Sequence, residues 1–109
     1  LWHAYPRIGF DERGQFDFLL AHPEHTAVLI AADAAGDWAD LAIKPIADLL
    51  REGQATGFFR DDVDPLTHAR LGLVLTLGYF AARRLTERWG EPTHWRDRAA
   101  DLIVRGCTW

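Results

Sequence analysis

The segment from Pro65 to Trp89 constrains the fold of this chain more than any other part of the sequence. It opens with a strong helix start, because Asp64 suits the N-cap position and proline suits the first helical position. Between residues 71 and 82 no charged residue interrupts either face of this helix. A helix on the outside of a small monomeric domain normally has a polar face. We therefore expect this helix to be central in the fold or to be covered on both sides.

Two apolar stripes run along this helix. The first repeats at spacings of three and four residues and consists of Leu71, Leu75, Gly78, Ala82, Leu85 and Trp89. The second lies on a different side and consists of Leu73, Leu77 and Phe80. A final helix, expected at about residues 94–106, adds a stripe of Trp95, Ala99, Leu102 and Ile103. The two helices can pack against a symmetry-related pair in a dimer. They can equally be covered by the chain's own earlier helices, and periodicity alone leaves both arrangements open.

The rest of the sequence also indicates an all-α fold. Period-two alternation of apolar and polar residues, which is typical of a half-buried strand, is absent. Helices are expected at about residues 11–20, 24–32, 38–53, 65–89 and 94–106. The sequence therefore predicts an antiparallel bundle of about five helices.

Prolines, glycines and capping residues set the boundaries of these helices. Pro23 separates the first two helices, because the residue before a proline disfavours the helical conformation. Pro45 lies inside the third helix and is expected to kink its axis. Asp37 suits the N-cap of the third helix, and Thr93 suits the cap of the last one. Gly57 is the expected left-handed residue after the third helix.

The charge of the chain argues against a nucleic-acid surface on these residues. The 109 residues carry a formal net charge of −4. Phosphate binding requires clustered lysines and arginines, whereas Lys44 is the only lysine here and the arginines are spread out. Apolar residues make up 49% and charged residues 26%, which is ordinary for a globular protein. The length suits one domain, and we expect a single folded domain at residues 1–109.

Cysteine use and the length of the apolar runs indicate a cytoplasmic protein. Cys107 is the only cysteine, so an internal disulfide is excluded and a reducing compartment is the natural inference. The longest apolar run, at 71–82, is interrupted by Thr76 and is shorter than the about 20 residues that cross a membrane. The N-terminal residues show no signal-peptide pattern. Because methionine is absent even at position 1, we expect this sequence to be a piece of a longer protein.

The stretch from Leu49 to Pro65 joins a helix end to a helix start in a specific order of residues. It resembles the C-terminal domain of the TetR family of transcriptional regulators, where a helix ends in the phrase EGxxxGxxRxDxDP and the first of two long dimer helices follows. Every fixed letter of that phrase is met here, by Glu52, Gly53, Gly57, Arg60, Asp62, Asp64 and Pro65. The stretches Phe18–Pro23 and Ala99–Gly106 are similar to a helix junction and to the terminal helix of the same domain. The resemblance covers roughly residues 11–107.

The resemblance implies an effector-binding and dimerisation domain, in which the last two helices form a four-helix interface with a second copy. The interface is then expected to contain the first stripe of the 65–89 helix and the stripe of the last helix. The family's helix-turn-helix domain is absent from this sequence, so operator DNA is expected to bind only through that missing N-terminal domain. The complete regulator, expected to be a repressor, would bind a pseudo-palindromic operator as a homodimer and release it when a small apolar or aromatic effector binds.

The effector pocket of this family lies between the middle helices, above the dimer helices. By position, the residues expected to line it are Phe16, Leu20, Trp38, Leu41, Ala42, Phe59, Tyr79 and Phe80. Aromatic side chains suit a pocket wall because they offer a large rigid apolar area with few torsions to freeze. Plain core packing is the alternative for each of these residues.

No pattern in the sequence indicates catalysis, a metal or a cofactor. It contains no GxSxG elbow, no glycine-rich phosphate loop and no HExxH motif, so we do not expect an enzyme. His22 and His25 are three residues apart, but Pro23 breaks the helix that would align them, and zinc requires three or four ligands. An alternative to the sensor function is a helical dimerisation or interaction module with the same dimer helices but no ligand pocket.

Overall fold

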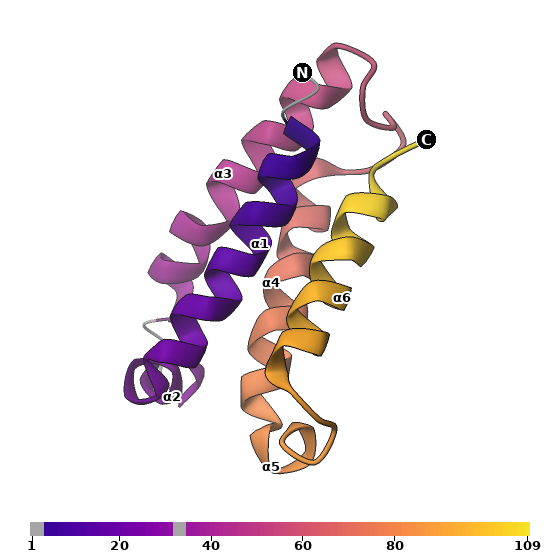
Figure 1. Cartoon of the computed structure of the whole chain (residues 1–109). Coiled ribbons are helices and arrows are strands. Elements are labelled where there is room, and N and C mark those ends of the chain that lie inside the picture. The colour runs from indigo at the N-terminus through magenta and orange to yellow at the C-terminus, as the bar shows by residue number, and fades with distance from the viewer. Residues whose placement is uncertain (1–3, 32–34) are drawn as a thin grey trace.

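The computed structural model describes the backbone of residues 4–31 and 35–109 and the side chains of residues 7–31 and 39–109. The described residues form six α-helices and no strand (Figure 1). The helices are α1 (Ala4–Ala21), α2 (Pro23–Ala31), α3 (Ala35–Ala55), α4 (Pro65–Ala81), α5 (Arg83–Thr86) and α6 (Pro92–Gly106). The predicted all-α bundle is confirmed. No helix in the described part of the chain is long and apolar enough to cross a bilayer.

Four long helices make up the bundle, and two short helices lie at one end of it. Figure 1 shows α1 running alongside α3 and α6, with α4 behind them, and it shows α2 and α5 at the same end. Helix α4 packs against both α3 and α6, and α1 contacts α2, α3, α4 and α6. Helix α2 crosses from α1 to α3 and also contacts α4. In this arrangement α1 and α4 contact each other, and each of them contacts both α3 and α6.

The hydrophobic core lies where α1, α3, α4 and α6 meet. It is made of buried side chains, among them Ile8, Ile46, Leu50, Phe59, Leu73, Ile103 and Cys107. Burying each large aliphatic side chain stabilises the fold by about 1.5–3 kcal/mol. Phe59 packs directly over Gly53 near the end of α3, where an added Cβ would overlap the phenyl ring. Gly53 is therefore required by the close approach of this ring.

The connection from α3 to α4 has the predicted capping chemistry. Gly57 adopts a φ of 79°, in the left-handed region that glycine tolerates, and the Phe58 N–H donates to the carbonyl of Gly53 at 2.8 Å. At the start of α4, Oδ2 of Asp64 accepts the backbone N–H of Thr67 at 2.9 Å, and Pro65 occupies the first turn. The predicted left-handed glycine and N-cap aspartate are both confirmed.

The predicted single helix at 65–89 is wrong in one respect, because it is broken at Ala82. That residue has φ −105° and ψ 34°, and the four-residue α5 follows it. The hydroxyl of Thr86 donates to the carbonyl of Tyr79 at 3.0 Å, so a side chain competes for a carbonyl of the last turn of α4. No proline or glycine marks the break, and the sequence pattern continues through it.

Three other helix starts differ from the prediction. Helix α1 begins at Ala4 and includes Pro6. A proline is tolerated in the first turn of a helix, because backbone N–H groups at these positions have no partner within the helix. Helix α3 begins at Ala35, upstream of Asp37, whose side chain lies outside the described residues. Helix α6 begins at Pro92, so the predicted Thr93 cap is wrong, because the proline at the first helical position moves the cap to Glu91.

Candidate functional site

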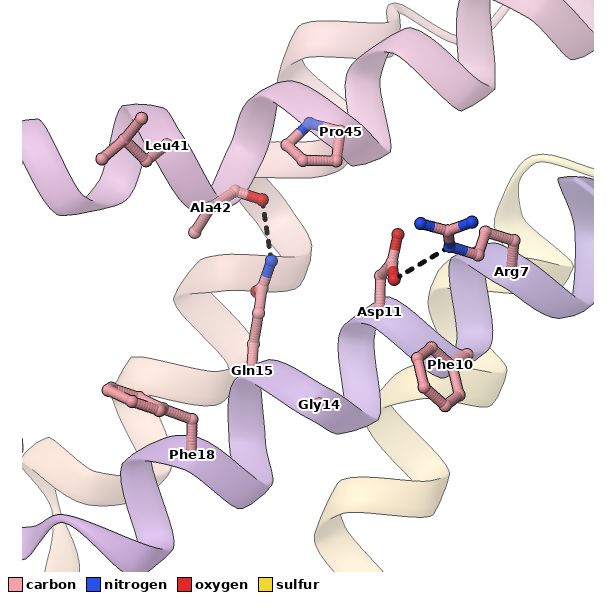
Figure 2. Close-up of a pocket in the computed structure, with 9 residues that line it drawn as sticks. All are labelled: Arg7, Phe10, Asp11, Gly14, Gln15, Phe18, Leu41, Ala42 and Pro45. Carbon is pink, nitrogen blue, oxygen red and sulfur yellow. Dashed lines mark hydrogen bonds and ion pairs between the residues drawn. The ribbon is translucent and has the colours of Figure 1, made fainter.

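A groove of about 390 Å³ lies between α1 and α3 (Figure 2). Its lining residues are Arg7, Phe10, Asp11, Gly14, Gln15, Phe18, Leu41, Ala42 and Pro45. The spacing of Phe10, Gly14 and Phe18 places all three on one face of α1, with the glycine between two phenyl rings. The walls are therefore mainly apolar, and the polar groups of the groove belong to α1.

The polar groups of this groove have partners within the protein, except that the buried Oε1 of Gln15 has no hydrogen-bond partner among the described residues. Nε of Arg7 lies 3.3 Å from Oδ1 of Asp11, so the two charges of the groove neutralise each other. Nε2 of Gln15 donates to the carbonyl of Ala42 at 2.8 Å, as Figure 2 shows. This bond ties α1 to α3 one turn before Pro45, which has no N–H of its own to donate to the helix. The groove therefore offers mainly apolar walls, no net charge and one unpartnered acceptor, the Oε1 of Gln15.

A second cavity, of about 340 Å³, lies between the α1–α2 corner and the end of α4. Its lining residues are Leu19, Leu20, Pro23, Thr26, Ala27, Ile30, Phe80 and Arg83. We call it the corner cavity. Pro23 ends α1 and lets α2 turn away, and this turn forms one side of the cavity. The hydroxyl of Thr26 donates to the carbonyls of Leu19 and His22, at 2.7 and 2.9 Å, so it is satisfied by the backbone.

Arg83 is the charged member of the corner cavity, and Tyr79 holds it in place. Nη1 of Arg83 donates to the hydroxyl of Tyr79 at 2.6 Å, and its Cζ lies 5.1 Å from the centre of the tyrosine ring. Tyr79 is buried, and its ring lies 5.2 Å from the rings of both Phe16 and Phe80. The guanidinium group is thus held by Tyr79, which is itself held in place by the rings of Phe16 and Phe80.

The residues predicted to line a pocket are divided between the groove, the corner cavity, a third cavity and the core. Leu41 and Ala42 line the groove, whereas Leu20 and Phe80 line the corner cavity. Phe16 and Tyr79 are buried directly behind Phe80, and Tyr79 also lines a third cavity, of about 220 Å³, together with Trp89 and Trp95. Phe59 is buried in the core against Gly53, and it lines none of these cavities. The side chain of Trp38 lies outside the described residues.

Sequence reasoning did not select Phe10, Phe18 or Arg83. The first two recur eight residues apart on one face of α1, and this spacing is a signal that periodicity analysis can detect. Arg83 has no comparable signal, because its position depends on the break at Ala82. Only the folded arrangement brings the guanidinium group next to α1 and α2.

Helices α4 and α6, with α5 and the connection between α5 and α6, also expose large apolar side chains, and we call this surface the α4–α6 face. Its large members are Leu71, Val74, Leu85, Trp89 and Leu102, all of them exposed. The small residues Gly78, Ala81 and Ala82 are exposed beside them. A group of exposed large apolar side chains on a globular domain indicates an interaction site.

The predicted dimer residues lie only partly on this face. Leu71, Gly78, Ala82, Leu85, Trp89 and Leu102 are exposed on it. Leu75 and Trp95 are half-buried, and the indole N–H of Trp95 donates to the carbonyl of Leu75 at 3.0 Å. Ala99 and Ile103 are buried, so this chain's own helices cover them. Val74 belongs to the face but was not in the predicted stripe.

Glu12 is the buried acid among the described residues, and its burial perturbs it. Only 3% of the residue is exposed, and its Oε1 has no hydrogen-bond partner in that part of the chain. Burial, and then the nearby charge of Asp11, raise the pKa of Glu12 to about 7. Glu12 lines neither the groove nor the corner cavity, and it faces Gly72 of α4.

The histidines near Pro23 pack against an aromatic ring. The ring of Phe18 stacks on His22 at 4.4 Å and meets His25 edge-on at 5.6 Å. Nδ1 of His22 lies 2.8 Å from the carbonyl of Phe18, in hydrogen-bonding distance. Among the residues that the structure describes, no group of three or more His, Cys, Asp and Glu side chains is arranged to hold a metal ion.

Comparisons of the chain with protein-family models, with curated proteins and with solved structures find no match.

Proposed function

We propose that this chain is the effector-binding and dimerisation domain of a TetR-like transcriptional regulator. The observation that carries the proposal is the α4–α6 face, an exposed apolar surface on a helix that also forms a wall of a ligand-sized cavity. The face and the cavity share α4, which contributes Val74 to the one and Phe80 to the other. A second copy would cover the face, and an effector would occupy the cavity.

The composition of the α4–α6 face suits a second copy of the chain. The large apolar side chains on it gain free energy when water is removed, at about 25 cal/mol per Å² of apolar surface. Gly78, Ala81 and Ala82 leave room for a helix of the partner to approach closely. A two-fold axis would pair α4 and α6 with the same helices of the partner in a four-helix interface.

The shared helix gives a physical route from effector to DNA. An effector that prefers one packing of α1 and α2 against α4 shifts the population toward that packing. The shift changes the angle between two copies that meet through α4 and α6, and so the spacing of the DNA-reading domains that precede them. In this proposal the regulator is a cytoplasmic homodimer that represses transcription until the effector binds.

A specific observation favours a second candidate, a dimerisation module without an effector. Phe16, Phe59 and Tyr79 are each buried among other side chains, as plain core packing predicts. In that case the groove and the corner cavity are surface irregularities that bind nothing.

Thermal unfolding in the presence of small compounds separates the two candidates. A panel of apolar and aromatic molecules is added to the chain, and the melting temperature is recorded for each. A ligand that binds only the native state raises the melting temperature in a concentration-dependent way. The sensor function predicts at least one such compound, whereas a module without a pocket predicts none. If the panel is inert while the chain still dimerises, the sensor function is contradicted.

A further inference from the structure

We infer that the corner cavity binds an apolar organic acid and that Arg83 receives its carboxylate. This inference rests on the proposed effector-binding function and adds the chemical class of the effector. The cavity is lined by aliphatic and aromatic side chains except for the satisfied hydroxyl of Thr26 and the guanidinium group of Arg83. A ligand that fills it must be largely apolar and must carry one group that complements a cation.

Arg83 differs from the other half-buried arginines in lacking an acidic partner. Arg13 and Arg96 pair with Asp97, at 3.1 and 2.9 Å, and Arg60 pairs with Asp62 at 2.7 Å. Arg83 forms no ion pair with any aspartate or glutamate of the described residues. A guanidinium group that is partly withdrawn from water is costly without a compensating anion.

Glu87 is the acid that the helical backbone brings nearest to Arg83 in sequence, since its N–H donates to the carbonyl of Arg83 at 3.0 Å. The two residues are four apart, the spacing at which side chains on a helix form ion pairs. The structure shows no such pair, and Arg83 instead contacts Tyr79 through both its Nη1 and the face of the ring. Arg83 also lines the corner cavity, together with apolar residues of α1 and α2.

The contact with Tyr79 leaves the guanidinium group able to bind a carboxylate. An arginine side chain has five N–H donors in a fixed plane, and the structure commits one of them to the tyrosine hydroxyl. Two parallel N–H donors match the two oxygens of a carboxylate, and such charge-assisted bonds are roughly twice as strong as neutral ones. Because Tyr79 is buried, the group is already positioned before the ligand arrives.

The dimensions of the cavity suit a small acid. A volume of about 340 Å³ lies at the lower end of the range for ligand sites. A carboxylate at Arg83 would direct a hydrocarbon chain along Leu19, Leu20 and Ile30. The same shape with a hydroxyl group would bind less tightly because it brings no charge, and an amine would be repelled.

Three eight-carbon probes test the inference: octanoate, 1-octanol and octylamine, each below its micelle concentration. Binding to the wild-type chain is measured by calorimetry and by the shift of the melting temperature. We expect octanoate to bind about tenfold or more tightly than octanol, and octylamine to bind most weakly. Equal binding of octanoate and octanol would overturn the acid assignment and leave the effector-binding function standing. Failure of all three probes overturns the inference, and the proposed function is then judged by the wider panel.

Two arginine variants show whether Arg83 is the residue responsible. Arg83→Gln is expected to remove the preference for octanoate and to leave octanol binding unchanged. Arg84→Gln is the matched control, because Arg84 is an exposed neighbour and the change in net charge is identical. An unchanged octanoate affinity in Arg83→Gln, or an equal loss in both variants, would contradict the assignment.

A third variant locates the site if Arg83→Gln folds poorly. Ala27 lines the corner cavity and is exposed, so Ala27→Trp fills the cavity without disturbing the core. We expect it to abolish binding of octanoate and octanol together while circular dichroism stays native. Undiminished octanoate binding in this variant would place the ligand elsewhere and overturn the inference.

Discussion

Gly72 of α4 provides the space that the carboxyl group of Glu12 occupies. A Cβ at position 72 would overlap Oε1 of that glutamate, and the side-chain carboxyl carbon lies almost as close. The absence of a side chain on α4 therefore allows an acidic side chain of α1 to enter the interior. There it is almost fully buried, and burial holds its pKa near 7. The contact between Gly72 and Glu12 therefore makes the packing of α1 on α4 sensitive to the protonation of Glu12.

The first prediction concerns the stability of the chain between pH 4.5 and pH 7. The pKa of Glu12 is about 7 in the folded state and 4.5 in the unfolded state, so the folded state holds the proton to higher pH. Stability is therefore greatest below pH 4.5 as far as this group is concerned, and it falls as the pH rises through 7. The free energy of unfolding is expected to drop by roughly 3 kcal/mol over this window. Urea denaturation at a series of pH values measures it.

Glu12→Gln is the control for this pH effect, because it keeps the shape and removes the charge. We expect the variant to be more stable than the wild type at pH 8 and to lose most of the slope between pH 5 and pH 7. An unchanged slope in the variant would show that another group carries the pH dependence.

A second prediction tests the space at Gly72. Gly72→Ala is expected to lower the free energy of unfolding by about 1–3 kcal/mol, because Glu12 or the helix must shift to admit the methyl group. Gly14→Ala is the comparison, since nothing lies within 4 Å of a Cβ at Gly14 in the interior of α1. It is expected to gain about 0.5–1 kcal/mol, the usual difference between glycine and alanine inside a helix. Chemical denaturation that ranks the two substitutions in the opposite order would contradict this packing.

The third prediction concerns the break between α4 and α5. Thr86 is buried and its hydroxyl donates to the carbonyl of Tyr79. Thr86→Val keeps the shape but leaves that carbonyl without its donor, which costs about 1–3 kcal/mol of stability. The exposed Thr93 is the matched position, and Thr93→Val is expected to change stability little. If Thr86→Val and Thr93→Val had the same melting temperature, the hydroxyl of Thr86 would not be a source of stability.

The helices that were predicted well are those whose limits are set by local chemistry. Asp64, Pro65 and Gly57 act on their own backbone neighbours, so a sequence pattern is enough to place the junction between α3 and α4. The break at Ala82 depends on a side chain several residues later that binds back to Tyr79. Since Ala82 is itself a good helix former, no local signal predicts the break.

The functional residues were predicted less well, because periodicity identifies the apolar face of a helix but does not show which other helix, if any, covers that face. Ala99 and Ile103 fall on the same apolar stripe as Leu102, yet only Leu102 is exposed, since α1 and α4 cover the other two. The burial of Glu12 depends on a glycine in a distant helix. Arg83 is selected by the absence of an ion pair, which is a property of the folded chain alone.

The fourth prediction concerns the α4–α6 face and uses two matched valines. Val74 lies on the face with 63% of its surface exposed, and Val28 lies on α2, away from the face, with 59% exposed. Val74→Glu places a charge in the proposed interface and is expected to give a folded monomer, with circular dichroism unchanged. Val28→Glu carries the same change in charge and is expected to remain a dimer. If the dimer dissociated in both variants, the added negative charge, and not its position on the α4–α6 face, would be the cause.

Sedimentation equilibrium of the wild-type chain at micromolar concentration shows whether the α4–α6 face meets a second copy. If the α4–α6 face meets a second copy, the measured mass is twice that of the 109-residue chain. A well-folded species with the mass of one chain, unchanged as the concentration rises, would contradict the account.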